Sequence, residues 1–218
     1  MGNEARARRS SRLWGGAPVL VFREEADRRT FLKGAALVGV GATFVATTRS
    51  DPRAFAQGSA SDLEILNYAL TLEYLEAEFY TQGIDGDLLS GRELELISPI
   101  RDHEQAHVSA ITETVQAMGG TPAEMPMFMF PDGTFTDRTM FLTAASMFEE
   151  LGVDAYHGQV ANIQSADVLG AAAAIAGVES RHAAILADLT GGNPFPAPFE
   201  DNKTMAEVLE LAGQFIQQ

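Results

Sequence analysis

Two short stretches of the sequence place a glutamate three residues before a histidine: Glu104 with His107, and Glu179 with His182. On a helix, residues three apart project from one face, so each pair presents a carboxylate oxygen and an imidazole nitrogen to one point. Carboxylate and imidazole ligands without sulfur favour iron or manganese over structural zinc. Each pair is therefore a candidate part of a metal site.

A further glutamate precedes each of these pairs at nearly the same distance. Glu73 lies 31 residues before the first pair, and Tyr80 follows it after seven residues. Glu149 lies 30 residues before the second pair, and Tyr156 follows it after seven residues. One Glu-x-x-His alone is common on solvated helices, whereas chance recurrence of the whole pattern at equal spacing is rare. The repeat predicts two matching halves of one centre.

The charges of this pattern indicate how many cations it needs. Four inward carboxylates are costly to bury unless cations offset them. Two divalent cations would neutralise them, and two neutral imidazoles would complete the ligand set. We therefore predict a dimetal site with six ligands: Glu73, Glu104, His107, Glu149, Glu179 and His182.

The two tyrosines are candidate catalytic groups beside the metals. Residues seven apart lie two turns along nearly the same stripe of a helix, so each tyrosine is expected to donate a hydrogen bond to the glutamate of its own helix. Tyr80 and Tyr156 are thus predicted to be hydrogen-bond donors, or sinks for an oxidising equivalent that escapes the metals.

Neighbouring residues leave alternatives for two of the ligands. Glu76 lies one turn after Glu73, and Glu150 directly follows Glu149. The seven-residue relation to a tyrosine favours Glu73 and Glu149 in both cases. The two remaining histidines, His103 and His157, are expected to be exposed or capping residues and not further ligands.

Helical periodicity predicts the elements that carry these residues. An N-cap and early acidic residues begin the first helix at Ser61, and apolar residues then recur at three- and four-residue steps. Helices are predicted over residues 61–83, 90–118, 138–164 and 166–189, with a short amphipathic helix over 203–215. Residues 121–137 form a long crossover between two helix pairs. The fold class is therefore all-α, a four-helix bundle with one long connection.

Composition excludes several classes of protein. The chain carries 15 Lys and Arg against 30 Asp and Glu, a formal charge of −15, so it lacks the basic face that nucleic acid requires. Hydrophobic residues make up 46%, enough for a real core. The absence of cysteine removes thiolate metal sites and thiol nucleophiles. No uninterrupted apolar stretch reaches the length of a membrane span, which argues against a multi-span membrane protein.

Residues 1–56 differ from the rest of the chain. They hold 10 basic and 5 acidic side chains, whereas the remainder has a formal charge of −20. The run Arg28-Arg29-Thr30-Phe31-Leu32-Lys33 resembles the bacterial twin-arginine export motif. A short Gly/Ala-rich apolar run over 34–48 and the small-x-small pattern at Ala54–Ala56 follow it. We expect a cleaved signal over 1–56, and a domain over 57–218 that reaches the periplasm or the exterior without a membrane span.

The domain resembles the ferritin-like superfamily of di-iron carboxylate proteins. It is most similar to exported bacterial ferritin-like domain proteins related to plant desiccation-related proteins, on the stretches 66–80, 103–107, 148–156 and 178–182. The resemblance implies that Glu73 and Glu149 are terminal ligands and that each histidine binds one metal. It implies that Glu104 and Glu179 bridge two iron ions, with manganese as the alternative.

A carboxylate-bridged pair of redox metals performs a limited range of chemistry. It reacts with dioxygen or peroxide, oxidises ferrous iron, or disproportionates peroxide. We therefore expect an exported stress-defence protein with one of these activities. The alternatives are a non-enzymatic desiccation-related protein with a structural metal site, and iron storage, which requires a homo-oligomeric cage.

Overall fold

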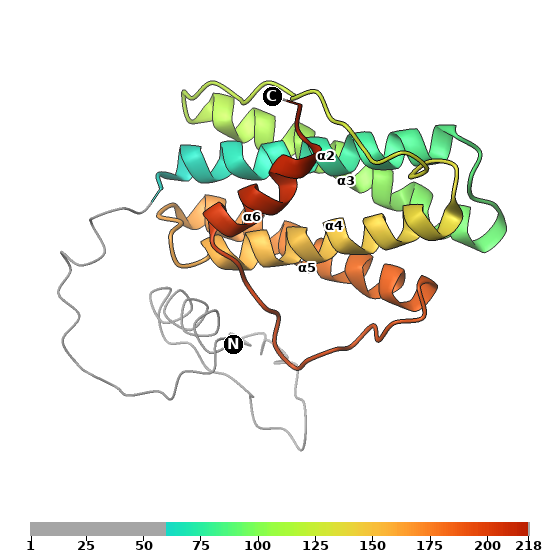
Figure 1. The fold of residues 1–218 in the computed structure, drawn as a ribbon. Helices are drawn as coiled ribbons and strands as arrows, with labels where there is room; N and C mark the ends of the chain where they lie inside the picture. Colours follow the sequence, from blue (N-terminus) through green and yellow to red (C-terminus); the bar gives the residue numbers. More distant parts are fainter. Residues whose placement is uncertain (1–59, 218) are drawn as a thin grey trace, which may run out of the picture.

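The computed structural model describes residues 60–217, which contain helices and no strand. The elements are α2 (Asp62–Asp85), α3 (Gly91–Ala117), α4 (Arg138–Gln159), α5 (Ala166–Leu189), α6 (Met205–Ala212) and the short 3-10 helix η1 (Gly213–Phe215). Figure 1 shows α2 beside α3 and α4 beside α5, with the crossover running along the bundle and α6 lying over α2 and α4. The predicted all-α bundle with a long connection is confirmed.

The export signal predicted over residues 1–56 lies outside the described residues. Among the residues that are described, no helix is both long and apolar enough to cross a membrane.

The third helix ends five residues earlier than its apolar pattern predicts. The prediction ran to Gln164, but α4 ends at Gln159. The carbonyl of Gln159 accepts hydrogen bonds from the backbone N–H groups of Asn162 and Ile163, which turns the chain. The side chain of Ile163 is buried in that turn. An apolar residue that the pattern assigned to the helix thus belongs to the loop.

Asp62 ties the start of α2 to the start of α5. Its carboxylate oxygens accept the backbone N–H groups of Gln164 at 2.7 Å and Ser165 at 2.6 Å, and the residue is 9% exposed. Asp62→Ala is expected to lower the free energy of unfolding by about 2 kcal/mol, because two backbone donors lose their partner. Urea unfolding measures the loss. The exposed Asp132→Ala should change stability by less than about 0.5 kcal/mol, and equal effects would contradict the assignment.

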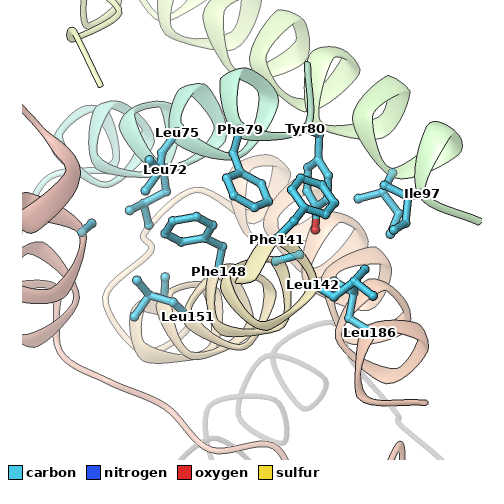
Figure 2. Close-up of a cluster of buried hydrophobic side chains, with 14 of the residues drawn as sticks. Leu72, Leu75, Phe79, Tyr80, Ile97, Phe141, Leu142, Phe148, Leu151 and Leu186 are labelled. Atoms are coloured by element: carbon cyan, nitrogen blue, oxygen red, sulfur yellow. The ribbon is translucent and has the colours of Figure 1, made fainter. Parts of the chain in front are cut away.

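Aromatic side chains of α2 and α4 fill the core at one end of the bundle. Phe79 stacks on Phe141 with ring centroids 4.8 Å apart, and it meets Phe148 edge-on at 4.9 Å. Figure 2 shows Phe79 and Tyr80 reaching from α2 toward these rings of α4. Gly83 allows the close approach, because a Cβ there would lie 2.0 Å from the Phe141 ring. This packing holds the α2 and α4 backbones in one register.

The crossover covers this core with alternate side chains. Phe128 and Phe130 pack against it, whereas Met127 and Met129 are 68% and 56% exposed. Such alternation is typical of an extended chain. The backbone N–H of Met129 donates to the carbonyl of Phe215 at 2.8 Å, which joins the crossover to the C-terminal segment.

Candidate metal centre

The four long helices bring all six predicted ligands into one buried cluster. α2 and α4 each supply one glutamate, and α3 and α5 each supply a Glu-x-x-His pair. Every one of these residues is at most 9% exposed: Glu73, Glu104, His107, Glu149, Glu179 and His182. Their role as metal ligands remains a prediction, but their convergence is a property of the fold.

The potential ligand atoms fall into two groups that share two carboxylates. Within each group the atoms lie within 4.8 Å of one another. Glu104 and Glu179 belong to both groups. Each group adds one glutamate and one histidine: Glu73 with His107, and Glu149 with His182. This arrangement can provide two adjacent cation positions that share two carboxylates.

The first imidazole faces three carboxylates at once. His107 Nδ1 lies 3.0 Å from Glu104 Oε2, 3.1 Å from Glu73 Oε2 and 3.2 Å from Glu179 Oε1. A ring nitrogen carries at most one proton, so it cannot donate fully to all three. This side of the cluster therefore has more acceptors than the protein has donors.

The second imidazole has polar contacts at both of its ring nitrogens. His182 Nδ1 lies 3.0 Å from Glu104 Oε1 and 3.2 Å from Glu149 Oε2. His182 Nε2 lies 2.9 Å from His103 Nδ1, and the two rings are stacked. His103 is exposed, as expected, yet it contacts a predicted ligand. A hydrogen bond at the outer nitrogen fixes the orientation of a ligand imidazole.

Three buried oxygens show that the cluster is short of positive partners. Glu104 Oε1 and both carboxylate oxygens of Glu179 are buried and accept no well-aligned hydrogen bond, although His182 Nδ1 lies 3.0 Å from the first and His107 Nδ1 lies 3.2 Å from Glu179 Oε1. Leaving such groups unpaired is costly. These oxygens belong to the two carboxylates shared by both groups, where a pair of bound cations would contact them. The donor set of carboxylate oxygen and imidazole nitrogen fits iron or manganese.

Without cations, protons must balance the charge. Burial, reinforced by neighbouring carboxylates, raises the pKa of Glu73 and Glu179 well above the usual range. Burial alone would lower the pKa of the histidines, but the surrounding carboxylates raise it to about 12 for His107 and about 10 for His182. Burial would raise the pKa of Glu104, yet the two imidazoles beside its carboxylate bring it to about 2. Cation binding would therefore release protons.

The tyrosines bond to the glutamates of the opposite helix, so the predicted pairing within one helix is wrong. Tyr80 donates to Glu149 Oε1 at 2.5 Å, and Tyr156 donates to Glu73 Oε1. Seven residues of helix span about 10 Å, which separates each tyrosine from the glutamate of its own helix. α2 and α4 run antiparallel, as Figure 1 shows, so the end of one stripe lies opposite the start of the other.

Removing either hydroxyl is expected to weaken the fold. Tyr80→Phe or Tyr156→Phe would leave a buried carboxylate oxygen without its donor, at a cost of about 1–3 kcal/mol. Thermal unfolding of the metal-free chain measures this loss. Tyr74→Phe, at a half-buried position on α2, is the matched control and should be nearly neutral. If all three variants unfolded like the wild type, these hydrogen bonds would carry no stability.

The structure separates the two alternative ligands. Glu150 is exposed on α4, outside the cluster. Glu76 is 4% exposed, and its charged neighbours are the carboxylates of the cluster. His157 is half-buried, and its Nδ1 lies 2.8 Å from the carbonyl oxygen of Val153 in the preceding turn. Only Glu76 therefore stands as a further candidate ligand. The seven-residue spacing to a tyrosine favoured Glu73 over Glu76, and it carried no information on whether Glu76 is buried.

Comparison with known proteins agrees with this architecture. A family model described as the ferritin-like domain matches residues 61–192, which include all four long helices and the six predicted ligands. No curated protein matches the chain. The match covers more than half of the sequence, and the chain therefore belongs to the ferritin-like domain family.

Proposed function

We propose that the chain is an exported dimetal carboxylate protein that oxidises ferrous iron, or reduces or disproportionates peroxide, in defence against stress. The observation that carries the proposal is the pair of shared carboxylates, Glu104 and Glu179, with buried oxygens that accept no well-aligned hydrogen bond. A bound pair of iron or manganese ions would supply one-electron chemistry to dioxygen or peroxide.

The protein groups around the centre have distinct tasks in this proposal. Glu104 and Glu179 would hold the two ions, and His107 and His182 would complete the ligand set from α3 and α5. Tyr80 and Tyr156 orient the outer carboxylates by hydrogen bonds. Burial raises the pKa of both phenols well above its usual value, so these groups stay protonated donors.

Ferrous iron and either dioxygen or peroxide test the activity directly. The purified chain should oxidise ferrous iron faster than buffer does, as followed by the absorbance of ferric product. Glu179→Gln should lose this acceleration, whereas the exposed Glu150→Gln should keep it. A wild-type chain that binds its metals and leaves the rate of oxidation unchanged would contradict the proposed activity.

A structural role for the metals is the second candidate. It is favoured by one observation: the cluster takes side chains from all four long helices, so bound ions would join both helix pairs. This candidate predicts a large rise in melting temperature on metal loading together with flat oxidation kinetics. Iron storage predicts instead that the chain elutes from a sizing column as a large hollow assembly.

Export is proposed from the sequence of residues 1–56 alone. Replacing Arg28 and Arg29 by lysine should leave the chain in the cytoplasm of a bacterial host, whereas the unaltered sequence should be exported and shortened. Cell fractionation with mass measurement distinguishes the two results. Export of the double variant at the normal level would contradict the twin-arginine assignment.

A further inference from the structure

The two halves of the centre differ at one position beside the ligands. Glu73 on α2 and Glu149 on α4 begin matching stripes, each of which ends in a tyrosine seven residues later. Three residues into these stripes, α2 carries Glu76 whereas α4 carries Gly152. The repeat that places the ligands is thus broken at this position, where one half has a carboxylate and the other has no side chain.

The antiparallel register places these two residues opposite each other. The hydrogen bonds from Tyr80 to Glu149 and from Tyr156 to Glu73 fix both ends of the facing stripes. The middle of one stripe therefore faces the middle of the other.

Gly152 leaves the space that the carboxylates occupy. A Cβ at this position would lie 3.2 Å from Glu76 Oε1 and 3.2 Å from Glu179 Oε2. That distance is shorter than an ordinary van der Waals contact, so one of the two carboxylates would have to shift by a few tenths of an ångström to admit a methyl group. Glu76 and the shared ligand Glu179 consequently approach the same small volume beside α4.

Glu76 lies in surroundings that are unfavourable for a bare carboxylate. It is 4% exposed, and the charged groups that act on it are four other glutamates of the cluster: Glu73, Glu104, Glu149 and Glu179. A buried acid among like charges destabilises a fold unless a positive partner or a proton offsets it.

We propose that Glu76 is a seventh protein ligand of the metal pair and that Gly152 is the position that admits its carboxylate. The inference rests on the dimetal function proposed above. Five carboxylates exceed the charge of two divalent ions by one, so this centre suits either an ion of higher charge or one retained proton. The surplus comes from the half that contains α2, because the matching position of the other half is Gly152.

Titration of the full-length chain with Co²⁺ tests this role. Glu76→Gln keeps the shape of the side chain and removes its charge, and Glu78→Gln is the matched control, since Glu78 accepts a hydrogen bond from Gln82 away from the cluster. Glu76→Gln should weaken binding of at least one Co²⁺ by about tenfold or more and alter its visible spectrum. Glu78→Gln should match the wild type in affinity, stoichiometry and spectrum.

A second variant keeps the test decisive if Glu76→Gln does not fold. Gly152→Ala should weaken Co²⁺ binding, whereas Gly177→Ala on α5, where a Cβ meets open space, should not. In a Glu76→Ala background the added effect of Gly152→Ala should shrink, because the methyl group then competes with one carboxylate fewer.

The outcomes separate this inference from the proposed function. Wild-type affinity and spectrum in Glu76→Gln, or identical behaviour of Gly152→Ala and Gly177→Ala, would overturn the seventh ligand and leave the dimetal centre standing. A wild-type chain that binds no Co²⁺ would overturn both.

Discussion

Replacing Glu104 by alanine is expected to abolish binding of both metal ions. Glu104 belongs to both ligand groups, so its loss removes one oxygen from each cation position. We expect the affinity for Mn²⁺ or Fe²⁺ to fall by about a hundredfold or more, since changes at groups that only support ligands already cost about 10- to 100-fold. Elemental analysis after dialysis measures the metal retained per chain.

Glu113→Ala is the matched control for this experiment. It removes an exposed carboxylate from the same helix, α3, and should retain the wild-type metal content. Circular dichroism verifies that both variants are helical. Retention of two metals per chain by Glu104→Ala would contradict the assignment of Glu104 as a shared ligand.

The metal-free protein is expected to lose stability as pH rises from about 5 to 10. The pKa values of Glu73 and Glu179 lie above 4.5 in the fold, and those of His107 and His182 are raised from 6.5 to about 12 and about 10. At pH values above the ordinary pKa values of these groups, 4.5 for glutamate and 6.5 for histidine, the folded chain holds more protons than the unfolded chain. Its free energy of unfolding therefore falls as pH increases toward the folded pKa values.

The effect should be large because several groups act in the same direction. We expect a loss on the order of several kcal/mol, which lowers the melting temperature by about 10 °C or more. Glu104 acts in the opposite sense, since its pKa is lowered to about 2, but only below its ordinary value of 4.5. Melting curves in about 0.5 M salt, which screens the exposed charges, isolate the buried cluster.

Metal loading should reverse this dependence. Cations replace the protons of the cluster, so metal affinity and the stability gained on loading should both increase with pH. The difference between loaded and metal-free melting temperatures at pH 6 and pH 9 provides the measurement. A metal-free chain whose stability does not change over this range would show that the cluster holds no extra protons.

The spacing of polar residues was sufficient to predict which glutamates and histidines converge. Glu104 with His107 and Glu179 with His182 share helix faces because of the helical period alone, and the repeat at 31 and 30 residues indicated that both halves face one centre. The helix boundaries followed from caps and turns, such as the capping box at Ser61. The early end of α4 could not be predicted, because Ile163 is apolar and its burial depends on the neighbouring helices.

The pattern within one helix could not predict contacts between side chains of different helices. The spacing of Tyr80 and Tyr156 identified the correct residues but the wrong partners, because the antiparallel register of α2 and α4 decides which stripe ends meet. His103 was dismissed as exposed, although its ring stacks on His182 from one helix to another. Gly152 had no visible role until the position of Glu76 opposite it was known.

Crystals of the chain grown with Mn²⁺, with data collected near the manganese absorption edge, test the central claim most directly. We predict two anomalous peaks inside the bundle, both contacted by Glu104 and Glu179, with His107 on one and His182 on the other. A single peak, two peaks without a common carboxylate, or peaks confined to the acidic surface would contradict a shared dimetal centre.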